Sequence, residues 1–186
     1  AIALLLRGGS RDEPEHAVGR LHLLEHLLLR RTATLSPQAL AQRIARLGGE
    51  VNAETGREYF GLLGRAPASR VPELAALLAS CLCRPAFDAI DLALEQGMIA
   101  AERTFMGQTS PLDALIRLAW PAHPLGRPLQ AADTPTVDPA ALSVLWSRHC
   151  VGARLQVAVT GAFDYTAVRA AFAQLADLPP GQPPPQ

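Results

Sequence analysis

Residues 19–30 read Gly19-Arg20-Leu21-His22-Leu23-Leu24-Glu25-His26-Leu27-Leu28-Leu29-Arg30. Two histidines, His22 and His26, stand four positions apart, and Glu25 directly precedes the second of them. On a helix of 3.6 residues per turn, positions i and i+4 share one face, so both imidazoles can reach the same ion. Leucine occupies most of the remaining circumference. The stretch therefore predicts a buried helix with a single polar stripe, because a solvated surface helix has a broad charged face.

The order His-x-x-Glu-His is typical of the inverted zinc motif of inverzincins. Neutral imidazoles are good zinc ligands, and a catalytic zinc ion has three protein ligands and one position open to water. A glutamate on the same helix that is not a ligand, here Glu25, can take a proton from that water. The alternative is a buried helix whose histidines bond to carbonyl groups and whose Glu25 pairs with an arginine. The spacing within a leucine-rich helix favours the zinc site.

The composition limits the class of protein. Of the 186 residues, 49% are hydrophobic and 18% are charged, and the formal net charge is zero. Nothing in this balance attracts nucleic acid or an anionic membrane, so we expect neither as a partner. The apolar residues 1–6 are too short to span a membrane and lack the features of a signal peptide. Three cysteines, Cys81, Cys83 and Cys150, indicate reduced, buried thiols and favour a bacterial cytoplasmic location.

Hydrophobic periodicity and turn residues predict helices interleaved with a few strands. Strands are expected at residues 1–7, 50–53, 58–65 and 154–160. Helices are expected at residues 17–30, 37–47, 68–83, 88–105, 111–119, 138–149 and 165–176, and residues 120–137 are expected to be irregular. This pattern predicts one α+β domain over residues 1–177, with helices covering a small mixed or antiparallel sheet. The proline-rich residues 178–186 are expected to form a tail or linker.

A zinc site needs a third ligand, and the spacing leaves several carboxylates open. Glu95 and Glu102 lie seven positions apart, about two helical turns, so they share one stripe of the helix expected at 88–105. The alternative for this pair is an ordinary solvated face. The residues alone would equally allow a ligand from among Asp88, Asp91, Glu50, Glu54 and Glu58.

Several segments together resemble the pitrilysin/insulinase family of zinc peptidases, which includes the mitochondrial processing peptidases. The resemblance extends from about residue 2 to residue 177. His22-Leu-Leu-Glu25-His26 is similar to the inverted zinc motif of this family, and residues 94–102 are similar to its downstream glutamate helix. Weaker matches are found at residues 9–14, 48–55, 123–128 and 159–161.

The resemblance implies a zinc-dependent metalloendopeptidase of the pitrilysin-like α+β fold, with Zn²⁺ as its cofactor. It implies that Glu25 is the general base and that Glu95 orients a ligand imidazole without binding the metal itself. The zinc ligands that it implies are His22, His26 and Glu102.

The resemblance also implies a peptide substrate and a partner. Asn52 and Ala53 would lie on a strand beside the site, to which an extended peptide could add. Relatives enclose the peptide between two homologous halves, the second of which supplies an arginine and a tyrosine; Tyr59 and Tyr165 do not match that tyrosine. We therefore expect a homodimer or a heterodimer with a second pitrilysin-like domain. The alternative is a non-catalytic subunit that binds peptides or acts as a scaffold, although such members have usually lost the motif that this chain keeps.

Overall fold

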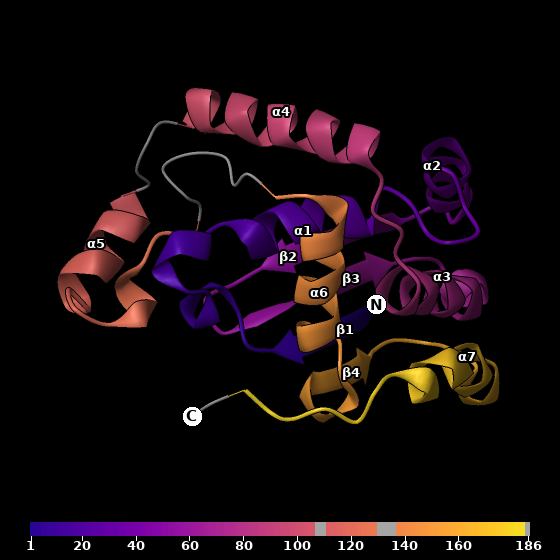
Figure 1. The fold of residues 1–186 in the computed structure, drawn as a ribbon. Coiled ribbons are helices and arrows are strands. Elements are labelled where there is room, and N and C mark those ends of the chain that lie inside the picture. The colour runs from indigo at the N-terminus through magenta and orange to yellow at the C-terminus, as the bar shows by residue number, and fades with distance from the viewer. Residues whose placement is uncertain (107–110, 130–136, 185–186) are drawn as a thin grey trace.

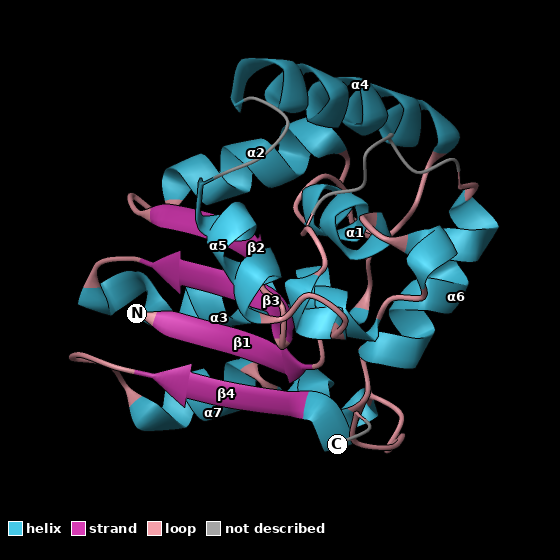
Figure 2. Cartoon of the chain, turned by 90° about the vertical axis from the view of Figure 1, so that its left-hand side faces the viewer, coloured by secondary structure: helices cyan, strands magenta, loops and turns pink. Residues whose placement is uncertain are grey.

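A four-stranded antiparallel sheet lies at the centre of the fold (Figure 2). The computed structural model describes residues 1–106, 111–129 and 137–184. The strand order is β2-β3-β1-β4, so β2 forms one edge of the sheet and β4 the other. The strands are β1 (Ile2–Arg7), β2 (Glu50–Thr55), β3 (Tyr59–Arg65) and β4 (Leu155–Val159).

Helices pack on one face of this sheet and beside it (Figure 1), whereas Figure 2 shows β1 and β4 with no helix in front of them on the other face. Helix α3 packs against β1 and β3 and against α7, whereas α1 lies beside β2 and α4 lies outside α1. The α+β fold expected from the sequence is confirmed, and its sheet is antiparallel. The helices are α1 (Arg20–Leu28), α2 (Pro37–Arg46), α3 (Val71–Cys83), α4 (Ala89–Met106), α5 (Pro111–Ala119), α6 (Pro139–His149) and α7 (Tyr165–Ala171).

The main hydrophobic core lies between one face of the sheet and helices α1 and α3. Successive side chains of a strand alternate between the two faces, which places Leu4 and Leu6 of β1 beside Phe60 and Leu62 of β3. All four side chains are fully buried. A second, smaller cluster joins α1, α4 and α6 and consists of Leu23, Leu27, Leu92, Ile99 and Leu142. Helix α4 is thus packed onto α1 by a small apolar contact of its own.

Side-chain caps explain where three of the helices begin. Ser36 accepts a hydrogen bond from Ala39 N at 3.3 Å before α2, and Asp138 accepts one from Ala141 N at 2.7 Å before α6. Asp164 plays the same part before α7. Such caps satisfy amide groups that have no partner within the helix, so these three starts agree with the sequence to within a residue.

Short 3₁₀ turns account for most differences from the expected boundaries. Residues 15–17 form such a turn, so the helix expected from residue 17 begins as α1 at Arg20. Likewise, a turn over residues 68–70 precedes α3, and another over residues 173–177 follows α7. Within the stretch expected to be irregular, residues 124–126 form a turn, whereas residues 130–136 lie outside the described residues.

The proline-rich end forms neither a helix nor a strand over residues 178–184, yet it is attached to the domain. The carbonyl groups of Pro179 and Pro180 accept hydrogen bonds from Gly152 N at 2.8 Å and Ala153 N at 2.9 Å. Arg154 Nε donates to the Gln182 carbonyl at 3.2 Å. This part of the chain therefore lies along the residues that precede β4.

The remaining expectations concern membrane-spanning segments and the cysteines. Among the residues with described positions, no helix is both long enough and apolar enough to cross a lipid bilayer. Cys81 and Cys150 are buried free thiols, and burial raises the pKa of Cys81 to about 12. These thiols are therefore protonated, poorly reactive parts of the core.

Candidate metal centre

Helix α1 presents His22, Glu25 and His26 on one side, as its sequence predicts. All three side chains are half-buried. The two imidazoles meet edge to face, with ring centroids 4.8 Å apart and an angle of 89° between the planes. The rest of the helix is anchored by five leucines that are each at most 1% exposed, namely Leu21, Leu23, Leu24, Leu27 and Leu28.

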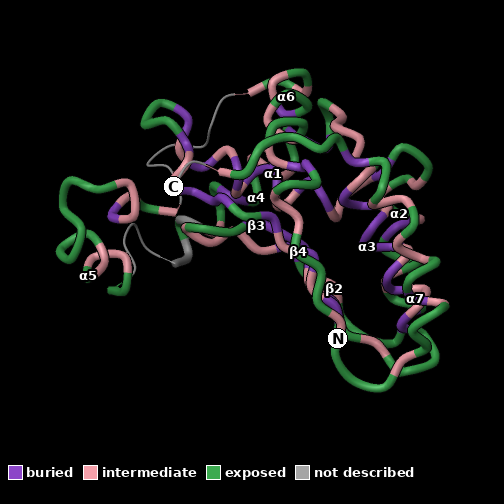
Figure 3. The backbone as a smooth tube through the Cα atoms, turned by 90° about the horizontal axis from the view of Figure 1, so that it is seen from below, coloured by how far each residue is buried: buried purple, intermediate pink, exposed green. Residues whose placement is uncertain are grey.

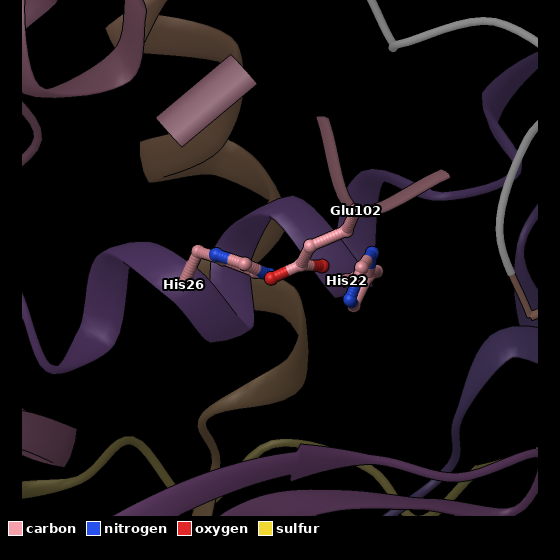
Figure 4. Close-up of side chains that lie close together, drawn as sticks. All are labelled: His22, His26 and Glu102. Carbon is pink, nitrogen blue, oxygen red and sulfur yellow. The ribbon is translucent and has the colours of Figure 1, made fainter. Parts of the chain in front are cut away.

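Helix α4 brings a carboxylate to these two imidazoles. Glu102 Oε2 lies 3.7 Å from His26 Nε2. One possible ligand atom from each of His22, His26 and Glu102 lies within 4.8 Å of the other two, and this is the group of metal-ligating side chains found among the residues that the structure describes. Figure 4 shows the Glu102 carboxylate reaching from α4 toward both rings. Residues some 80 positions apart thus converge on one point.

The donor set is suited to zinc. Zinc binds histidine nitrogen and carboxylate oxygen at about 2.0–2.2 Å, so ligand atoms of a tetrahedral site lie roughly 3.3 Å apart. The 3.7 Å between His26 Nε2 and Glu102 Oε2 is close to this spacing. Burial, assisted by the charge of neighbouring His26, lowers the pKa of His22 to about 4. His22 is therefore neutral at pH 7, which is the form that binds a metal.

Glu95 fixes the orientation of the second imidazole. Its Oε2 atom lies 3.1 Å from His26 Nδ1. A carboxylate at this position favours the tautomer with its proton on Nδ1, which leaves the lone pair of Nε2 on the side of Glu102. The role of Glu95 stays a prediction, but the contact that this role requires is present.

Glu25 lies beside this group of ligands, next to the end of strand β2. Burial raises the pKa of the Glu25 carboxyl, although hydrogen bonds with Thr55 and the charge of His26 oppose the shift. Thr55 is the last residue of β2, and its hydroxyl also donates to the Leu21 carbonyl at 3.4 Å. The edge strand is therefore attached to α1 at the position of Glu25. A raised pKa makes a carboxylate a better proton acceptor near neutral pH.

The other carboxylates that the spacing left open have different partners. Asp88 accepts a hydrogen bond from Ile90 N at 2.8 Å at the start of α4, and Asp91 pairs with Arg30 and Arg31, which follow α1. The structure thus brings Glu102, and not these side chains, to the histidines. The remaining pairs are Glu50 with Arg65, Glu54 with Tyr59 and Glu58 with Arg11.

Strand β2 carries the two residues that the resemblance implicates in substrate binding. Asn52 is exposed, whereas Ala53 is 5% exposed and its side chain belongs to the main core. Ala53 can therefore offer a peptide only its backbone. A cavity of about 360 Å³ lies beside Asn52 and is also lined by Leu63 and Ala158, but none of its lining residues belongs to the His22–His26–Glu102 group. The substrate roles of Asn52 and Ala53 stay predictions.

The start of α1 is held by Glu13, a residue that sequence analysis missed. Glu13 is 3% exposed, and its carboxylate accepts hydrogen bonds from Gly19 N at 3.0 Å and Leu21 N at 2.7 Å. Gly19 occupies the cap position with φ of 87° and has no side chain to satisfy these amides. Burial raises the pKa of Glu13 in spite of the backbone hydrogen bonds. No local pattern sets Glu13 apart from its neighbour Glu15.

Glu13→Ala is expected to lower the free energy of unfolding by about 2 kcal/mol, because it removes a cap and leaves buried amides without partners. Urea denaturation of the metal-free chain measures this change. The matched control is Glu15→Ala, since the Glu15 side chain is 87% exposed and its removal should cost less than about 0.5 kcal/mol. Equal stability of the two variants would show that Glu13 does not hold the helix start.

Comparison with known proteins identifies the family. Residues 1–133 match the family model described as insulinase, peptidase family M16. The chain belongs to this family. An M16 relative from Mycobacterium tuberculosis, called an uncharacterized zinc protease, is 34% identical over 125 residues, which are 65% of this chain and 28% of the relative. The probable mitochondrial-processing peptidase subunit beta of Arabidopsis thaliana is 31% identical over 129 residues, 68% of this chain and 24% of that protein.

Solved structures share the M16 fold. The peptidase M16 inactive domain from Pseudomonas fluorescens superimposes with a TM-score of 0.80 at 20% identity, covering all of this chain and 47% of that one. Pitrilysin superimposes with a TM-score of 0.77 at 23% identity, covering 94% of this chain and 20% of pitrilysin. The chain thus spans about a quarter of the length of the M16 relatives named above and less than half of these solved chains.

Proposed function

We propose that this chain is the metal-binding domain of a zinc metalloendopeptidase that hydrolyses peptides or short unfolded segments. The observation that carries the proposal is the convergence of His22, His26 and Glu102, with Glu25 beside them. M16 relatives that are named zinc proteases support zinc as the ion. The three converging side chains would be its ligands.

A bound zinc ion supplies Lewis acidity, which lowers the pKa of water and polarises a carbonyl group. The chain's own part is to orient the ligands and to move the proton. Glu25 accepts a proton from the attacking water as the bond from oxygen to the carbonyl carbon forms. The same carboxyl then returns this proton to the amine nitrogen as the carbon–nitrogen bond breaks. Glu95 keeps His26 in the tautomer that offers Nε2 to the metal.

The peptide would bind along strand β2. This strand is at the edge of the sheet, and its end at Thr55 contacts Glu25. An extended peptide can pair with the backbone of an edge strand and so gains affinity without a sequence requirement. Asn52 and Ala53 lie two to three residues before Thr55, about 7–10 Å along the strand. A peptide paired there would pass its backbone across the proposed catalytic group.

A second M16-like domain, as a subunit or a further part of the protein, would complete the site. Helix α5 has no buried residue and projects from the rest of the domain (Figure 3). Large hydrophobic side chains that are exposed close together on a protein surface mark an interface with another protein. Seven of the eleven exposed large hydrophobic side chains on the described surface lie within residues 90–120, namely Ile90, Leu94, Met98, Leu112, Leu115, Leu118 and Trp120.

One observation favours a second candidate function, a non-catalytic subunit that binds peptides or acts as a scaffold. The structural neighbour from Pseudomonas fluorescens is described as an inactive domain. That likeness concerns the fold, whereas the peptidase proposal rests on the four side chains at the candidate centre. The two functions can therefore be distinguished by measuring whether those side chains bind zinc and support peptide hydrolysis.

A native mass spectrum of the zinc-supplied chain, with an assay on a mixture of unstructured peptides, tests the proposal. We expect one zinc ion per chain in a dimer, with hydrolysis that a chelator abolishes and added zinc restores. Zinc on a monomer without hydrolysis would keep the metal site and require a different chain as the partner. A chain that binds no zinc would contradict the peptidase and leave the non-catalytic subunit.

A further inference from the structure

A buried carboxylate, Asp91, joins the first turn of α4 to the residues that follow α1. Asp91 is 3% exposed. Its Oδ1 accepts a hydrogen bond from Arg30 Nε at 3.2 Å, and its Oδ2 accepts one from Arg31 Nε at 2.7 Å. Burial raises the pKa of Asp91, but the hydrogen bonds from the two arginines outweigh burial, so the pKa is lowered overall. The carboxylate is therefore ionised at neutral pH and is bound on both oxygens.

Arg30 also reaches the side chain that orients the metal-binding imidazole. Its Nη1 lies 3.7 Å from Glu95 Oε1, while the other oxygen of Glu95 lies 3.1 Å from His26 Nδ1. Contacts thus run without a break from Asp91 through Arg30 and Glu95 to His26. The last atom in this series, His26 Nε2, faces Glu102.

The charges explain why an arginine is needed at position 30. Asp91 and Glu95 are four residues apart on α4, where two like charges repel each other. Glu95 is also largely buried, with 12% of its side chain exposed. A guanidinium group can bond to both carboxylates at once because its planar fork carries five donors, whereas a lysine ammonium is a compact point charge.

Arg31 provides a natural comparison. It has nearly the same exposure as Arg30, with 32% and 35% of the side chains exposed. Among the ion pairs of the described residues, Arg31 contacts Asp91, whereas Arg30 contacts both Asp91 and Glu95. Both arginines attach α4 to the residues after α1 through Asp91. Of the two, Arg30 alone contacts Glu95, whose carboxylate lies against His26.

We propose that Arg30, anchored by Asp91, is a positioning residue for the metal centre: it holds the Glu95 carboxylate, which holds His26 with Nε2 toward the metal. This inference rests on the proposed zinc site. Partners of this kind, beyond the ligands themselves, change metal affinity by about 10–100-fold when they are removed. Because Arg30 acts through one more side chain, we expect an effect near the lower end of this range.

The test compares Arg30→Gln with Arg31→Gln. Zinc affinity is measured by competition with a chromophoric chelator, and the visible spectrum of the Co²⁺-substituted chain reports the geometry at the metal. We expect Arg30→Gln to weaken zinc binding about tenfold and to alter the Co²⁺ spectrum, whereas Arg31→Gln changes neither. Arg30→Lys should recover part of the affinity, because it keeps the charge but not the fork. Thermal unfolding of the metal-free chains measures the purely structural effect of both arginines.

A double-mutant cycle decides whether Arg30 acts through Glu95. In a Glu95→Gln background, the effect of Arg30→Gln on zinc affinity should disappear. Wild-type affinity in Arg30→Gln, equal losses in both arginine variants, or an undiminished loss in the Glu95→Gln background would each overturn the positioning role. A wild-type chain that binds no zinc would instead overturn the proposed function, so the two failures are distinguishable.

Discussion

Glu25→Gln is expected to lower kcat for peptide hydrolysis by about 10²–10⁴-fold, which is the usual contribution of a general base. Glutamine has the size and shape of glutamate but cannot accept the proton of the attacking water. The native surroundings favour this role for glutamate, because burial raises the pKa of the Glu25 carboxyl. Zinc binding should persist in the variant, since Glu25 lies outside the group of converging ligand atoms.

The measurement is the hydrolysis rate at saturating peptide, together with the zinc content of the same preparation. Glu15→Gln is the matched control, because it makes the same chemical change at a side chain that is 87% exposed. The control should hydrolyse peptide at the wild-type rate. Full hydrolysis by Glu25→Gln with zinc bound would exclude Glu25 as the base, and loss of zinc from this variant would instead make Glu25 a ligand.

His22→Ala is expected to weaken zinc binding by about 10²–10³-fold. Zinc sites with four protein ligands have apparent binding free energies of about 10–16 kcal/mol, so one ligand contributes about 3–4 kcal/mol. His22 is also already in its neutral, metal-binding form at pH 7, because burial lowers its pKa to about 4. A metal ion therefore has no proton to displace from it. Removing it leaves His26 and Glu102 with too few donors to complete the site.

Competition with a chelator of known affinity measures this change, and peptide hydrolysis should fall in parallel. His16→Ala is the control, because His16 is an exposed histidine that lies only six positions earlier in the chain. The control should bind zinc as the wild type does. Stoichiometric zinc at wild-type affinity in His22→Ala would contradict the ligand assignment.

The motif helix was predictable because its signal is local. Two histidines at i and i+4 within a run of leucines define both a helix and its polar face, and α1 has that face. Its first residue was not predictable. Gly19 has no side chain with which to cap the helix, and Glu13 supplies the missing acceptor from six residues upstream. A cap that arises from chain folding of this kind leaves no periodic pattern in the sequence.

The third candidate ligand shows the limit of spacing arguments. Seven carboxylates were chemically acceptable as the third zinc ligand. The seven-residue spacing of Glu95 and Glu102 did not single out one of the seven. The family resemblance singled out Glu102, and the structure places this carboxylate with the two histidines. The pairing of Asp91 with Arg30 could not be foreseen at all, because it depends on how α4 crosses α1. Contacts between distant residues of ordinary type carry no sequence signature.

Helix α4 has a consequence for how the domain would respond to its surroundings. Leu92 and Ile99 pack it against α1, Asp91 bonds to Arg30 just after α1, and Glu102 follows Ile99 by three residues on the same helix. A metal ion held by Glu102 would therefore be coupled to the way α4 packs on α1. A partner that contacted the exposed apolar side chains of α4, such as Leu94 and Met98, would act on the same packing. If the metal and such a partner both bind, thermodynamic reciprocity requires that each change the affinity of the other by the same factor.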